Sequence, residues 1–196
     1  MKKKSFNFSI FQSFNSTSGQ MLIEAMVAIS VFLIGILGMF NLLNQSLGLN
    51  KIVSSRYIAS DLAMEGVEVV KNIIDANVAQ GKWNDDINNG CYEIAYNSQK
   101  LSSLPSKKIT DCDLNASIND IKKGLTYLNF DKKTGIYSYS AGSPTIFKRV
   151  VKIKNLPENC SPGDCNEIKV NSIVTYSIKG GNYEIDVEDH FFNWKL

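Results

Sequence analysis

The sequence has little of what enzymes commonly use. It contains a single histidine, His190, and no serine or cysteine pattern of an activated nucleophile surrounds it. It also has no glycine-rich loop of the kind that holds phosphates. We therefore expect neither catalysis nor a cofactor. The formal net charge of +2, from 21 Lys and Arg against 19 Asp and Glu, argues neither for nor against nucleic acid, so no nucleic-acid partner is indicated.

Charged residues are missing between Ala25 and Asn50. Within this window the run up to Leu43 is almost wholly apolar, interrupted only by Ser30, two glycines and Asn41. A helix over that run would rise ~28 Å, close to the ~30 Å thickness of a bilayer core. The segment therefore predicts one membrane-spanning helix. Proline is absent there too, and two interpretations of its small residues stay open: a place where the helix can bend, or close helix packing in lipid.

One carboxylate, Glu24, lies at the edge of the apolar run, five residues after Gly19. An acid carried into lipid costs ~2.5–3.5 kcal/mol, so Glu24 requires a positive partner. Further upstream, Lys2, Lys3 and Lys4 are expected to hold the N-terminal side in the cytoplasm by the positive-inside rule.

This arrangement resembles the N-terminus of a type IV prepilin or pseudopilin, in which a basic leader and a glycine precede Leu-Ile-Glu and an apolar helix. The resemblance implies that prepilin peptidase cuts between Gly19 and Gln20 and that the new amine of Gln20 is methylated. The family usually has Phe or another apolar residue at this position, and Gln20 departs from it, which bears more on methylation than on cleavage. The resemblance also implies that Glu24 receives the N-terminal ammonium of a neighbouring subunit, which fixes axial register.

Two ordinary interpretations of the same segment remain open. The first is an uncleaved signal-anchor, in which Glu24 is an acid favoured by the helix dipole. The second is a cleaved secretory signal with Ser46-Leu47-Gly48 as the small-x-small site, although its leading region would then be unusually long.

The predicted organisation has three parts: a leader over 1–19, a hydrophobic transmembrane and assembly helix over 20–50, and an extracytoplasmic head over 51–196. The head begins with an amphipathic continuation of the helix over 51–76, because small and apolar residues recur at spacings of three and four. This stripe, which we expect to pack on the core of the head, consists of Ile52, Ser55, Ala59, Leu62, Ala63, Gly66, Val67, Val69, Val70, Ile73 and Ile74.

The last third of the chain alternates apolar and polar residues at period two. The pattern predicts an antiparallel meander with strands over 146–154, 168–178 and 183–187, and Gly180-Gly181 closes its second hairpin. An outward acidic row of Glu184, Asp186 and Glu188 could pair with lysines of the other strands. The fold class is therefore α+β, with a long helix packed on an antiparallel sheet.

The segment 77–145 is harder to interpret. Cys91–Tyr96 is typical of a short strand, and Asp131–Gly135 predicts a hairpin turn between 125–130 and 136–140. The Asn, Asp and Gly residues between 81 and 90 could suggest calcium, but they fit no known ligand loop, and turns are favoured.

All four cysteines lie beyond residue 90, which indicates an oxidising compartment and two disulfides. Pro162-Gly163 would turn the chain between Cys160 and Cys165, so that pairing is the simplest and leaves Cys91 with Cys112. Three connectivities are possible, and a four-cysteine zinc site is the rival, but only one close cysteine pair is present. No metal site is therefore expected.

Later motifs resemble minor pilins of the pilus-modification (PilV-like) kind, namely Leu62–Glu68, Phe147–Val150, Gly180-Gly181 and Phe192–Trp194. The resemblance implies a minor structural subunit of a type IV pilus, first a single-pass cytoplasmic membrane protein and then part of the pilus at the cell surface. Its partners would be major and minor pilins, prepilin peptidase, the inner-membrane assembly platform and membrane lipid. Two alternatives stay open: a pseudopilin of a type II secretion or DNA-uptake machine, and an anchored binding module that never polymerises.

Overall fold

The computed structural model describes residues 17–102, 107–110, 112, 114, 124–158, 160 and 165–194. The predicted leader up to residue 16 and the predicted turn at Pro162-Gly163 lie outside these residues. The chain divides into two compact units, Met1–Lys51 and Ile52–Leu196, and each is described by itself.

Helix α1 spans Thr17–Ala79 and contributes residues to both units. It is uninterrupted because its sequence contains no proline, which would remove a backbone hydrogen bond. It runs three residues beyond the predicted boundary at residue 76. Gly81, with φ of 76°, donates its N–H to the carbonyl of Val78 at 3.0 Å and so closes the helix in a left-handed turn.

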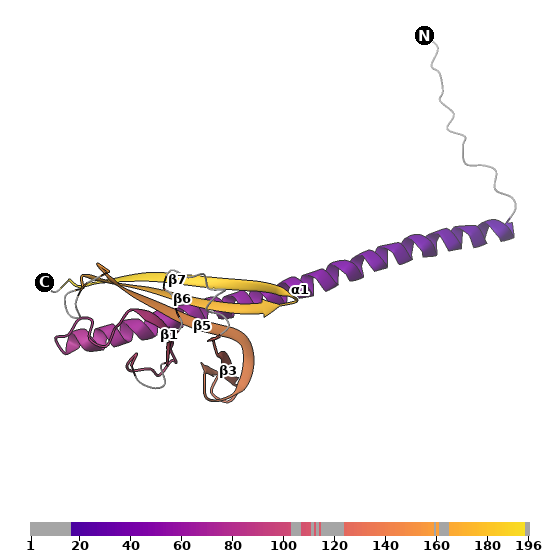
Figure 1. Cartoon of the computed structure of the whole chain (residues 1–196). Coiled ribbons are helices and arrows are strands. Elements are labelled where there is room, and N and C mark those ends of the chain that lie inside the picture. The colour runs from indigo at the N-terminus through magenta and orange to yellow at the C-terminus, as the bar shows by residue number, and fades with distance from the viewer. Residues whose placement is uncertain are drawn as a thin grey trace, which may run out of the picture. The chain divides into compact units, whose positions relative to one another are not determined.

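The head contains one seven-stranded sheet in which every pair of strands is antiparallel. Its strands are β1 (Gly90–Glu93), β2 (Lys107–Ile109), β3 (Tyr127–Asp131), β4 (Ile136–Ser138), β5 (Ser143–Leu156), β6 (Glu167–Ile178) and β7 (Gly181–Phe192). The long strands β5, β6 and β7 form a meander (Figure 1). On its other side β5 pairs with β1, which carries β2, and with β3, which carries β4. The α+β layout is therefore as predicted.

The predicted strands are present, and the three strands of the meander are longer than expected. The meander is confirmed, but its second turn lies one residue before the predicted Gly180-Gly181. Lys179 and Gly180 form it with φ of 50° and 80°, and Gly181 is the first residue of β7. The hairpin around Asp131–Gly135 is confirmed as β3 and β4. The strand predicted over 91–96 is the shorter β1, while β2 was not predicted.

The head's part of α1 packs on one face of the sheet. The predicted stripe is confirmed, because Ala59, Leu62, Val70 and Ile73 are buried in clusters with residues of β5 and β6. Gly66 allows the closest approach: a Cβ there would lie 2.3 Å from the hydroxyl oxygen of Ser172 on β6. The opposite side of the helix is not purely charged, since Val53, Tyr57 and Met64 are at least half exposed there.

The other face of the sheet is covered in part by the segment that follows β1. Leu125 is buried there with Val150 of β5 and Ile173 of β6, together with Cys91. The partly buried residues packed against them are Ile109, Cys112 and Leu114.

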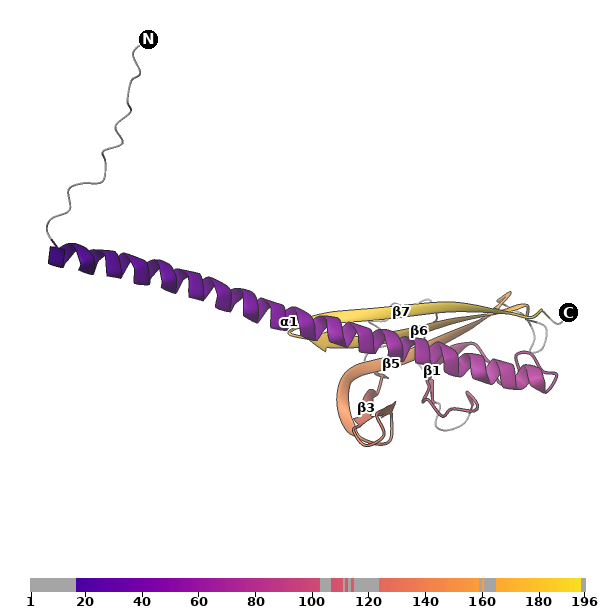
Figure 2. The ribbon, with the colours of Figure 1, turned by 180° about the vertical axis from the view of Figure 1, so that it is seen from behind.

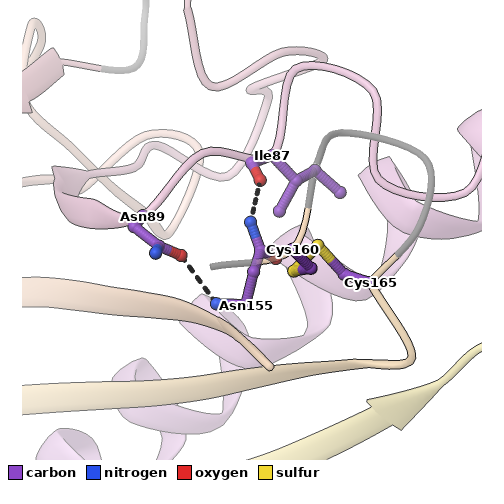
Figure 3. The surroundings of a disulfide bond; sticks show 5 residues. All are labelled: Ile87, Asn89, Asn155, Cys160 and Cys165. Atoms are coloured by element: carbon purple, nitrogen blue, oxygen red, sulfur yellow. Dashed lines mark hydrogen bonds between the residues drawn. A yellow bond between two sulfur atoms is a disulfide. The ribbon is translucent and has the colours of Figure 1, made fainter. Parts of the chain in front are cut away.

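Two disulfides tie down loops of the head. Cys91 bonds to Cys112 and Cys160 bonds to Cys165, the partners favoured on spacing, and no cysteine is left for a zinc site. Beside the second disulfide, Asn155 donates its Nδ2 to the carbonyl of Ile87 at 2.7 Å and its backbone N–H to Oδ1 of Asn89 at 2.6 Å (Figure 3). These bonds fix the turn before β1 against the end of β5.

Candidate functional site

The first half of α1 exposes an apolar surface. Among the described residues of its unit nothing packs against its side chains, and Met21 is 72% exposed, Phe32 66% and Leu33 53%. The helix is long and apolar enough to cross a membrane. Ser30, a polar residue inside this stretch, donates its hydroxyl to the carbonyl of Met26 at 2.7 Å. The hydroxyl is thereby satisfied within the helix, as an apolar surrounding requires.

Glu24 is the one charged side chain at the start of this surface. Its carboxylate is exposed and, within the part of the chain that the structure describes, it makes no ion pair or hydrogen bond. Apolar residues flank it on both sides, among them Ile23 and Met26, which are more than 60% exposed. The carboxylate can therefore bind a positive group that comes from outside this helix.

Gly19 and Gln20, the residues on either side of the predicted cleavage site, lie in the first turns of α1. Gly19 is exposed and has open space where a Cβ would be. The structure places Gly19, Gln20 and Glu24 on one helix near its N-terminal end. The predicted processing and assembly roles remain predictions.

The head contains a buried ion pair whose role was not predicted. Arg149 points inward from β5 and is fully buried; its Nη1 lies 3.0 Å from Oε1 of Glu65 and donates to the carbonyl of Leu62 at 2.8 Å. Its Nη2 donates to the carbonyl of Ile94 at 2.5 Å. Burial raises the pKa of neighbouring Tyr139 to about 12, so that phenol stays protonated. The pair joins the helix motif Leu62–Glu68 to the strand motif Phe147–Val150.

A signal for this pair was present in the sequence. Phe147, Arg149 and Val151 alternate toward the core, and a charged residue at an inward position demands a buried partner. Glu65 supplies it from the edge of the helical stripe, beside the buried Leu62 and Gly66.

The predicted acidic row is present on the solvent face of β7, where Glu184, Asp186 and Glu188 are exposed. Lys169 of β6 lies 2.7 Å from Glu188 and, with His190 and Asn171, lowers the pKa of that carboxyl to about 2. Lys154 of β5, one of the lysines that could have paired with the row, contacts Glu158 instead. The reason is that β6 lies between β5 and β7.

The single histidine lies in the same region. The two ring nitrogens of His190 contact the carboxylates of Glu167 and Glu188, and these hydrogen bonds raise its pKa. Both nitrogens are therefore occupied. In the described ranges no three His, Cys, Asp or Glu side chains are grouped to hold a metal ion.

The segment Gly19 to Glu24 and the apolar surface that follows it are thus the candidate site, because the described residues offer Glu24 no positively charged partner. Comparison of the chain with protein-family models, with curated proteins and with solved structures found no match.

Proposed function

We propose that this protein is a minor structural subunit of a type IV pilus or a related filament, cut between Gly19 and Gln20 and assembled through the first half of α1. The observation that carries the proposal is a single acid, Glu24, which has no partner among the described residues and lies at the start of a charge-free, exposed apolar helix. Its spacing of five residues from Gly19 is the spacing of the resemblance described above.

Two features of the apolar helix support assembly with other helices. Its exposed side chains would be stabilised by burial, at ~25 cal/mol for each Å² removed from water, whether lipid or neighbouring helices cover them. Glu24 distinguishes burial in lipid from burial against neighbouring helices, because lipid tails offer no positive group to a carboxylate. A free N-terminal ammonium on a neighbouring helix offers such a positive group, and the resulting ion pair would set the axial position of one subunit against the next.

The first test is the mass of the mature chain isolated from cells. We expect the mass of residues 20–196 with both disulfides formed, with or without one added methyl group. An intact chain that still carries Lys2–Lys4, or a chain that begins at Leu49, would contradict the proposal.

The second test replaces the acid. Glu24→Val should leave the amount of protein in the membrane unchanged or raised, and should lower its amount in sheared filaments by about tenfold or more, which corresponds to ~1.4 kcal/mol. Ser30→Ala, which removes a hydroxyl already bonded to its own helix, is the matched control and should leave both amounts unchanged. Equal filament content for Glu24→Val and the parent chain would refute the role of Glu24.

A further inference from the structure

β7 leaves one long backbone edge without a neighbouring strand. It pairs with β6 over its full length of 12 residues and, among the strands that the structure describes, with no other. Figures 1 and 2 show it as the outermost strand of the meander from both sides. An edge of this length is a template on which another chain can add a strand.

The hairpin geometry determines which backbone groups point away from the sheet. Lys179 and Gly180 form a two-residue turn, so Ile178 and Gly181 are a hydrogen-bonded pair. Bonded and non-bonded pairs alternate from there, and the N–H and C=O groups of the even-numbered residues of β7 therefore point outward. The backbone N–H of His190 is one of these, and it donates to Oδ1 of Asp189 at 2.8 Å, which ends the open edge at that residue.

The residues with outward backbone groups also carry the acidic row. In a strand every second residue shares both an edge and a face, so Asp186 and Glu188 combine an outward backbone with a carboxylate on the solvent face. Lys169 and Asn171 approach Glu188 from the β6 side. A strand added beyond β7 would meet the row from its other side.

The acidic row determines which kind of strand can pair with the outer edge of β7. A second copy of β7 laid antiparallel would set carboxylates opposite carboxylates, which is destabilising. A strand with a basic residue at every second position would set opposite charges together, and each such pair would strengthen binding by about 1.4- to 5-fold. We propose that the outer edge of β7 binds an antiparallel strand of another protein that carries basic side chains at alternate positions, level with Asp186 and Glu188. This proposal does not depend on the function proposed for α1.

The test uses the full-length chain in detergent micelles and a labelled peptide of about eight residues that alternates Lys and Thr. In an antiparallel complex the lysines share the face of the acidic row, and their N–H groups point at β7. Methylating the backbone nitrogens of the lysines should therefore weaken binding by at least about tenfold, because the ladder bonds are lost. Methylating those of the threonines, which point away, is the matched control and should change binding by less than about threefold.

A second measurement keeps the peptide unmodified and follows amide hydrogen exchange by NMR. Saturating peptide should slow exchange at Asp186 and Glu188 by at least about tenfold, and should leave Val187, already paired with β6, unchanged.

Three outcomes would overturn the proposal: no binding of the unmodified peptide, equal binding of the two methylated peptides, or no slowing at Asp186 and Glu188. Slowing at these amides with rising protein concentration and no peptide would assign the edge to a second copy, and the proposal would again be wrong.

Discussion

The buried pair of Arg149 and Glu65 allows a quantitative prediction. Glu65→Ala would leave the guanidinium of Arg149 fully buried with two backbone carbonyls and, among the described residues, no ion-pair partner. Breaking a fully buried ion pair costs ~3–5 kcal/mol. The side chain of Glu65 is 34% exposed, so solvent can compensate in part, and we expect a loss of ~1–3 kcal/mol in the free energy of unfolding.

The same substitution should cost almost nothing once the arginine is gone. Arg149→Met fills a similar volume without charge and loses the hydrogen bond to the buried carbonyl of Ile94, at ~1–3 kcal/mol. In that background Glu65 has no buried charge to balance, and Glu65→Ala becomes a surface change within ~0.5 kcal/mol. The double-mutant cycle should therefore give a coupling energy of ~1–3 kcal/mol.

Urea unfolding of the full chain in detergent, followed by the fluorescence of Trp83, measures these energies. Trp83 packs against the head's core, while Trp194 is 77% exposed, so Trp194→Phe should be the common background. With a slope of ~2 kcal/mol per molar urea, a loss of ~2 kcal/mol would move the midpoint by about 1 M. Equal costs of Glu65→Ala in both backgrounds would refute the assignment of Glu65 as the counter-charge.

Two further predictions concern the head. Gly66→Ala should lower the free energy of unfolding by ~1–3 kcal/mol, because its Cβ would lie 2.3 Å from the hydroxyl oxygen of Ser172. Adding Ser172→Ala should restore most of this loss. An unchanged free energy in the single variant, or no recovery in the double variant, would contradict this packing. His190 has a folded-state pKa raised above 6.5 by Glu167 and Glu188, so its stabilising contribution is present below about pH 6.5 and lost as pH rises through the folded-state value. The melting-temperature difference between the parent chain and His190→Gln should therefore shrink from about pH 6 to about pH 9, and a constant difference would refute it.

The sequence predicted the meander because local pattern and pairing agree there. Alternation identifies the buried face of β6, and the two adjacent glycines locate the turn to within one residue of its position at Lys179 and Gly180. The end of β7 was predicted five residues too early, at Val187, because Glu188, Asp189 and His190 interrupt the alternation. Pairing with β6 continues to Phe192 since edge-strand residues need not be apolar to hydrogen-bond.

Other parts of the head carry no local signal. β2 contains three residues, two of them exposed lysines, and is a strand because its partner β1 positions it. The acid of the helix that pairs with Arg149 is likewise determined by tertiary packing, since several acids follow Leu62 at similar spacing. Sequence periodicity predicts faces, but it does not predict which residues of two faces meet.

The charged side chains buried in the head have partners, whereas Glu24 on the apolar helix has none among the described residues. This difference bears on what Glu24 binds. Within the described residues the head has two buried charged side chains, and both have polar partners: Arg149 contacts Glu65 and two carbonyls, leaving only its Nε without a hydrogen bond, and Glu93 accepts hydrogen bonds from the N–H and the hydroxyl of Thr126. Both buried charges therefore have partners within the head, whereas Glu24 has no partner among the described residues.

If lipid alone covered the helix, Glu24→Val would remove only a cost and would be neutral or favourable in every respect. If the carboxylate pairs with a neighbouring subunit, the same change keeps the chain in the membrane but removes the group that sets its place in the filament. Membrane content and filament content should then move apart, whereas a general folding defect would lower both together. Opposite changes in these two amounts are therefore the result that separates assembly from simple anchoring.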